Sequence, residues 1–115
     1  MLKRTETAVL DLSVLRESIG DRPELIADVM ASFLLAIDTE LDALLRAADQ
    51  SDATMTTRAA HRIKGAARAV GATRLAELCQ SIEAAAHVSS WDSVHRCLQR
   101  FPVAVEEVAD AIRGP

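Results

Sequence analysis

One stretch near the middle of the chain combines residue types suited to phosphoryl chemistry. It reads Arg58-Ala59-Ala60-His61-Arg62-Ile63-Lys64-Gly65-Ala66-Ala67-Arg68. At about 100° per residue in a helix, the apolar stripe of this stretch predicts that His61 projects to the opposite, solvent side. Lys64 at i+3, Gly65 at i+4 and Arg68 at i+7 are expected near the same outer face.

Gly65 is the most informative neighbour of His61. Glycine inside a helix costs about 1 kcal/mol relative to alanine, and Gly65 does not face the predicted core. On the exposed face it removes bulk beside the imidazole, so another protein's active site could approach closely. With Lys64 supplying positive charge, this pattern predicts a histidine that accepts a phosphoryl group. The basic residues by themselves are more typical of an ordinary solvated face.

The chemistry expected of His61 is that of a carrier. Neutral imidazole can attack phosphorus without a dedicated base. The chain has no glycine-rich phosphate loop and therefore no visible means of using ATP. Phosphoryl transfer needs charge neutralisation and in-line positioning, so metal and acid groups are expected from a partner. We predict a phosphocarrier without enzymatic machinery, cofactor or metal of its own.

Length and composition limit the classes of protein. The chain has 115 residues, enough for one domain, and is 50% hydrophobic but only 3% aromatic, which favours helices. A net charge of −4 argues against a general nucleic-acid binder. No apolar run approaches the roughly 20 residues of a membrane span. Cys79 and Cys97 form no CxxC pair and are predicted to be core thiols of a reducing, cytoplasmic compartment.

The start of the chain predicts a flexible segment followed by a short helix. Residues 1–9 are polar and are expected to be flexible. Leu12, Leu15 and Ile19 then recur at helical spacing, and Gly20 follows as a stop. We expect this helix to be an accessory lid on a larger unit.

Four longer helices are predicted to follow. For the first, Asp21 is expected to cap, with Pro23 in the first turn and Glu24 completing a capping box, and the helix should run to about residue 48.

The remaining helices are expected over residues 53–70, 73–86 and from Ser89 or Ser90 to 112, with Pro102 kinking or splitting the last one. The inward stripe of the 53–70 helix is predicted to be Met55, Ala59, Ile63, Ala66 and Val70. Short connections between amphipathic helices predict an all-α, antiparallel four-helix bundle over residues 10–113.

The motifs of this region resemble those of the histidine phosphotransfer (HPt) domain family. The resemblance rests on Ala60-His61-Arg62-Ile63-Lys64-Gly65-Ala66-Ala67, Val70-Gly71-Ala72, Leu75, Leu78-Cys79 and Ile82-Glu83, and on the upstream Gly20-Asp21-Arg22-Pro23-Glu24-Leu25. It covers about residues 10 to 112. One departure is Ala66, where many relatives have serine.

The resemblance implies roles for individual residues. His61 would be the phosphorylated residue, through its Nε2 atom. Lys64 would stabilise the phosphoryl group, Gly65 would leave room for docking, and Arg62 and Arg68 would support these steps. A glutamine orients the histidine in some members, so Glu83 is expected to orient His61 at most.

The resemblance also implies partners and a setting. Phosphoryl groups would pass between His61 and aspartates of response-regulator receiver domains, which would supply Mg²⁺. A cytoplasmic monomer without nucleic-acid or membrane contact is expected. The polar start and the end at Gly114-Pro115 favour a C-terminal domain excised from a hybrid sensor kinase over a stand-alone protein.

Three alternatives belong to other classes. A structural adaptor bundle would carry His61 incidentally. The dimerisation module of a sensor kinase typically has an acidic residue and a proline after its histidine, whereas Arg62 follows here and no proline precedes Pro102. A basic-helix nucleic-acid binder would lose affinity steeply with salt, and we rank it lowest.

Overall fold

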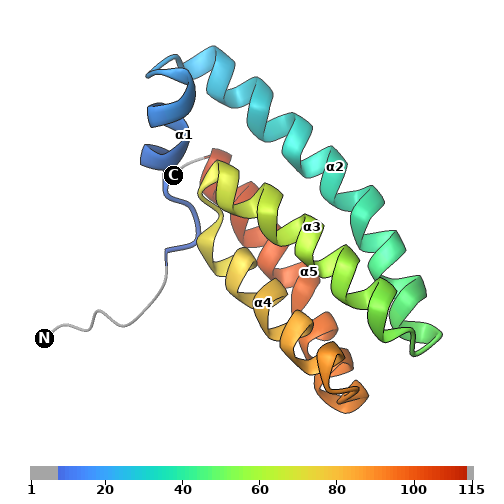
Figure 1. Ribbon diagram of the computed structural model, residues 1–115. Coiled ribbons are helices and arrows are strands. Elements are labelled where there is room, and N and C mark those ends of the chain that lie inside the picture. Colours follow the sequence, from blue (N-terminus) through green and yellow to red (C-terminus); the bar gives the residue numbers. More distant parts are fainter. Residues whose placement is uncertain (1–7, 114–115) are drawn as a thin grey trace, which may run out of the picture.

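Five α-helices make up the part of the chain that the structure, a computed structural model, describes, namely residues 8–113. They are α1 (Leu12–Ile19), α2 (Pro23–Asp49), α3 (Ala53–Val70), α4 (Thr73–His87) and α5 (Trp91–Arg113). Figure 1 shows α2 to α5 packed side by side, with α1 at one end of them. The prediction of an all-α, antiparallel four-helix bundle with a short accessory helix is confirmed.

The N-terminal segment lies against the turn between α3 and α4. The backbone N–H of Asp11 donates to the carbonyl of Gly71 at 2.8 Å, and the carbonyl of Ala8 accepts from the N–H of Arg74 at 3.2 Å and from the Thr73 hydroxyl. Most of the segment predicted to be flexible, residues 1–7, lies outside the described residues. Its last residues, 8 and 9, contact the bundle, which differs from the predicted boundary at residue 10.

The start of α2 differs from the prediction. Arg22 occupies the N-cap position without a side-chain cap, and Pro23 begins the helix. The carboxylate of Asp21 instead lies 3.4 Å from Nε of Arg16 in α1. The predicted Asp21 cap and its capping box with Glu24 are therefore wrong. Proline lacks an N–H and presets the helical φ, so this helix begins with one donor fewer to satisfy.

The bounds of α3 agree with the prediction, but its buried face is rotated. The carboxylate of Asp52 caps the helix by accepting from the N–H of Met55 at 3.0 Å. The prediction that Met55 faces the core is wrong, because its side chain is 44% exposed and Thr56 is buried in its place. Ala66 is only half-buried. Since α3 packs most extensively against α4 and also against α2, its buried arc is shifted toward α4.

α5 is one unbroken helix through Pro102, so the predicted split is wrong. The ring of Pro102 is exposed, where the lost backbone hydrogen bond can be replaced by water. The backbone of Ser90 takes part in the start of this helix, since its carbonyl accepts from the N–H of Val94. Its hydroxyl, however, bonds the Ser93 hydroxyl at 3.0 Å rather than a backbone donor.

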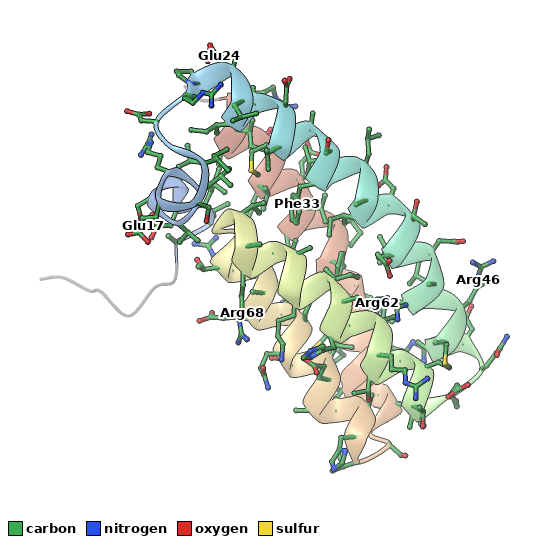
Figure 2. The ribbon with its side chains drawn as sticks, turned by 45° about the horizontal axis from the view of Figure 1, so that its top comes forward. Glu17, Glu24, Phe33, Arg46, Arg62 and Arg68 are labelled. Atoms are coloured by element: carbon green, nitrogen blue, oxygen red, sulfur yellow. The ribbon has the colours of Figure 1, made fainter. Side chains whose placement is uncertain are left out.

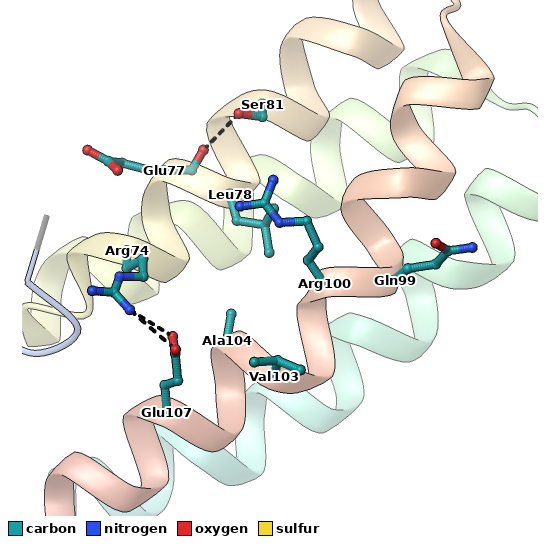
Figure 3. Close-up of a pocket in the computed structure, with 9 residues that line it drawn as sticks. All are labelled: Arg74, Glu77, Leu78, Ser81, Gln99, Arg100, Val103, Ala104 and Glu107. Atoms are coloured by element: carbon teal, nitrogen blue, oxygen red, sulfur yellow. Dashed lines mark hydrogen bonds and ion pairs between the residues drawn. The ribbon is translucent and has the colours of Figure 1, made fainter. Parts of the chain in front are cut away.

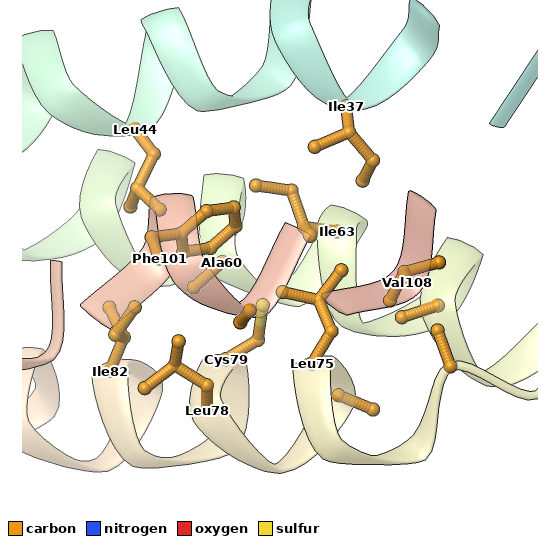
Figure 4. Packing of buried hydrophobic residues seen from close by; sticks show 14 of the residues in the cluster. Ile37, Leu44, Ala60, Ile63, Leu75, Leu78, Cys79, Ile82, Phe101 and Val108 are labelled. Carbon is orange, nitrogen blue, oxygen red and sulfur yellow. The ribbon is translucent and has the colours of Figure 1, made fainter. Parts of the chain in front are cut away.

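A single hydrophobic core runs between the four long helices (Figure 4). Its largest fully buried side chains include Phe101, Met30, Ile37, Leu44, Ile63, Leu75 and Ile82. Cys79 is fully buried among them, and burial, followed by the nearby charge of Glu83, raises its pKa to about 12. Its thiol is therefore protonated at neutral pH. The burial of Cys79 confirms its predicted place in the core. Among the described helices, none is long and apolar enough to cross a membrane.

Candidate functional site

His61 lies in the middle of α3 with its side chain 69% exposed, so its predicted exposure is confirmed. The Nδ1 atom of its ring lies 3.0 Å from Oε2 of Glu83, which α4 presents across the interface between the two helices. The opposite ring nitrogen, Nε2, makes no hydrogen bond to any of residues 8–113. The two ring nitrogens therefore have different environments, one fixed by protein and one open.

Glu83 connects His61 to Lys64. Its carboxylate is largely buried. Oε2 contacts Nδ1 of His61, and Oε1 forms an ion pair with Lys64. Burial acts to raise the pKa of Glu83, but hydrogen bonds from Lys64 and His61 outweigh it and lower the pKa below its usual value. The carboxylate is thus ionised at neutral pH and accepts a proton-bearing Nδ1. In the neutral imidazole this leaves the lone pair on Nε2.

Lys64 does not lie on the outer face, and that prediction is wrong. The residue is only 8% exposed. Its Nζ donates to Gln80 Oε1 at 2.9 Å and pairs with Glu83. The rotation of α3 toward α4 explains the difference, because it moves Lys64 to the edge of the helix interface, where the aliphatic part of its side chain is buried. Sequence reasoning missed Gln80, although it precedes Glu83 by one turn and shares its face of α4.

Gly65 leaves an open surface next to His61. It is exposed, and a Cβ added there would meet no atom within 4 Å. Gly65 is therefore not required for helix packing, in agreement with the prediction that it faces solvent.

The two arginines predicted to support the site lie in different environments. Nε of Arg62 donates to Glu40 Oε1 on α2 at 2.9 Å, so this side chain bridges α3 to α2 rather than to the His61–Glu83 pair. Arg68 is exposed and makes no hydrogen bond or ion pair to the described residues. Figure 2 shows both on α3. The structure thus brings together His61, Lys64 and Glu83 and directs Arg62 elsewhere.

A groove of about 480 Å³ between α4 and α5 lies away from this cluster (Figure 3). An ion pair between Arg74 and Glu107, at 3.2 Å, closes part of it. No histidine or cysteine lines the groove. Within residues 8–113 no group of three or more His, Cys, Asp or Glu side chains is placed to hold a metal ion. The candidate site is therefore the surface around His61.

This surface can perform one kind of chemistry readily. An exposed Nε2 with its lone pair available can attack an electrophile, and an ionised carboxylate on Nδ1 stabilises the positive charge that then develops on the ring. The open space at Gly65 admits a bulky reactant, such as an active site on another protein.

Comparisons with known proteins gave one match. A family model described as the Hpt domain matches residues 28–114, a range that includes most of α2, all of α3 to α5 and the whole His61 cluster. No curated protein and no solved structure matches the chain.

Proposed function

The chain belongs to the Hpt-domain family, and on that premise we propose that it carries a phosphoryl group on His61 between receiver domains of a two-component phosphorelay. Hpt domains are phosphocarriers of phosphorelays, lack kinase machinery and interact with receiver domains. The observation that carries the proposal for His61 is the asymmetry of its ring, with Nδ1 on Glu83 and Nε2 open to solvent.

The proposed step is a direct transfer. The lone pair of Nε2 attacks the phosphorus of a receiver's aspartyl phosphate, and the bond between phosphorus and the aspartate oxygen breaks. The aspartate leaves as a carboxylate with the bonding electron pair. The proton on Nδ1 stays in place, so the phosphorylated ring is cationic and donates to the ionised carboxylate of Glu83. Transfer to a second receiver reverses these bonds on a different aspartate.

The cluster around His61 serves positioning and docking in this proposal. Glu83 fixes the tautomer and the direction of the imidazole. Lys64 keeps Glu83 ionised, and its direct contact with the phosphoryl group stays a prediction. Gly65 admits the receiver, while Arg68 and Arg62 are proposed to favour an acidic docking surface, the latter with part of its charge balanced by Glu40. We expect Mg²⁺ to be bound by the receiver.

The proposal extends to the oligomeric state and the cellular location of the domain. We propose that the domain acts as a monomer in the cytoplasm, alone or as part of a hybrid sensor kinase, without contacting nucleic acid or membrane. Light scattering after size exclusion tests the monomer, because a kinase dimerisation module would elute as a dimer.

The proposal is tested by incubating the full chain with receiver domains phosphorylated by acetyl phosphate and detecting acid-labile, base-stable phosphate on the chain. We expect labelling of the wild type and no labelling of His61→Gln. His87→Gln and His95→Gln are matched controls, because both of these histidines are also exposed. Equal labelling of His61→Gln, or no labelling of the wild type by receivers or by phosphoramidate, would overturn the assignment and favour an adaptor bundle.

A further inference from the structure

The ammonium group of Lys64 is already paired within the protein. Its Nζ lies between the carboxylate of Glu83 and the amide oxygen of Gln80, and its charge is balanced by Glu83. A phosphoryl group on His61 Nε2 would bring two negative charges to the opposite end of the ring. Neutralising that charge calls for a cation on the exposed side of His61 that has no acidic partner.

Arg58 is placed on that side. At about 100° per residue, it lies about 60° around the helix from His61, whereas Lys64 lies about 60° away in the other direction. Since Lys64 is at the buried edge against α4, Arg58 is on the solvent side. Residues three apart in a helix are neighbours, with Cβ atoms about 5–6 Å from each other.

The guanidinium of Arg58 is available. Arg58 is exposed, and its side chain forms no hydrogen bond or ion pair with any of residues 8–113. The sequence has no acidic residue between Asp52 and Glu77, so none of its neighbours along α3 competes for it. In this respect Arg58 differs from Arg62, which forms an ion pair with Glu40.

Separation along the helix axis distinguishes Arg58 from Arg68. Arg58 is the i−3 neighbour of His61, about 4.5 Å from it along the axis. Arg68 lies two turns away on the C-terminal side. Arg58 can therefore reach a group on Nε2 with a short movement of its flexible side chain, while Arg68 is farther from it.

We propose that Arg58 is the cation that contacts the phosphoryl group carried on His61, while Lys64 acts through Glu83. This inference rests on the proposed function. In chemical terms, the guanidinium donates hydrogen bonds to two phosphoryl oxygens and stabilises their dianionic form. No bond is made or broken at Arg58, and its effect is on the charge of the carried group.

The test labels the full chain with phosphoramidate, a small donor that needs no receiver, and follows the phosphohistidine by ³¹P NMR as the pH is changed. In Arg58→Gln we expect the pH midpoint of the phosphoryl group to rise by about 0.5 unit, as for the loss of a unit charge about 6 Å away in water. The labelling rate should fall about threefold, as the same 0.5 unit implies. Arg58→Lys should keep the wild-type midpoint, and Arg68→Gln, the matched control, should shift it less.

Two outcomes separate this inference from the proposed function. If the wild type is labelled at His61 but Arg58→Gln keeps its midpoint, or if Arg68→Gln shifts it as much, the role of Arg58 is overturned and the carrier function stands. If the wild type takes no phosphate, both are overturned. Added NaCl gives a second measurement, because screening should reduce the difference in midpoint between the wild type and Arg58→Gln. A difference that salt leaves unchanged counts against the inference.

Discussion

The two glycines of the α3 region, six residues apart, serve opposite purposes. Gly71 ends the helix in the left-handed conformation with φ +82°, and an added Cβ would overlap the backbone carbonyl of Asp11. Gly65 lies within the regular helix, and an added Cβ there would meet nothing. The fold requires the first glycine, whereas it is weakened by the second. A residue that weakens its own helix and touches nothing points to a requirement outside the chain.

The largest effect on stability is expected at the end of α3. Gly71→Ala should lower the free energy of unfolding by about 2–4 kcal/mol, because it combines left-handed strain of about 1–2 kcal/mol with displacement of the Asp11 backbone. Urea denaturation followed by circular dichroism measures the change. A loss below about 1 kcal/mol would mean that the N-terminal segment moves aside freely, and the contrast with Gly65 would then be weak.

A smaller loss is expected at Lys64, beside Gly65 but on the buried edge of the helix. Lys64→Ala leaves the carboxylate of Glu83 without its ion-pair partner and should destabilise the fold by about 2 kcal/mol at pH 7. Lys64→Met, which keeps the aliphatic volume, separates lost charge from lost packing.

The loss at Lys64 should depend on pH in a defined direction. The pKa of Glu83 is lowered in the folded chain, so its ion pair adds stability above the unfolded pKa, near 4.5. That stability disappears as the pH falls through the folded value. The difference between wild type and Lys64→Met should therefore be full at pH 7 and shrink as the pH falls below about 4.5. A difference independent of pH would assign the whole effect to packing.

A gain in stability is expected when Gly65 is replaced by alanine, the same substitution that destabilises the fold at Gly71. Gly65→Ala should raise the free energy of unfolding by about 0.5–1 kcal/mol, because alanine is the better helix former and meets no neighbour. Thermal denaturation under the conditions used for Gly71→Ala makes the pair a direct comparison. A loss of stability at Gly65 would show that the position has a structural purpose after all.

A loss of function without a loss of stability is expected from Gly65→Leu. Helix content and melting temperature should stay close to those of Gly65→Ala, since the position is open. Transfer from a phosphorylated receiver should slow by tenfold or more, about 1.4 kcal/mol of lost docking. Labelling by phosphoramidate should not change. Unchanged transfer from the receiver would remove the functional reason for this glycine.

The sequence predicted what depends on local periodicity and failed where a distant helix decides. The bounds of α3, the stop at Gly71 and the exposure of His61 follow from spacing within one helix. The burial of Lys64 and the exposure of Met55 depend on how far α3 is rotated toward α4. The residue pattern of α3 alone does not predict this rotation. In the same way, the approach of Asp11 to Gly71 joins residues 60 positions apart, and Asp21 was bound to Arg16 instead of capping α2.

The candidate site, like the fold, could be predicted only in part from the sequence. His61 and Gly65 could be placed from α3 alone, and the resemblance directed attention to Glu83 on α4. The pairing of Glu83 with both His61 and Lys64 needed the three-dimensional arrangement, as did the contact between Lys64 and Gln80. Conversely, the availability of Arg58 becomes visible only once the partners of Lys64 and Arg62 are known.

The attachment of Ala8 and Asp11 to the α3–α4 turn has a consequence for fusion proteins. Gly71 lies ten residues after His61, about 15 Å along the helix axis, so the tether point is remote from the nucleophile. A domain joined ahead of residue 8 would be held at that end of the bundle by backbone hydrogen bonds. Even with a short linker it could be attached without covering the imidazole, which makes this end the natural place for a cargo or reporter.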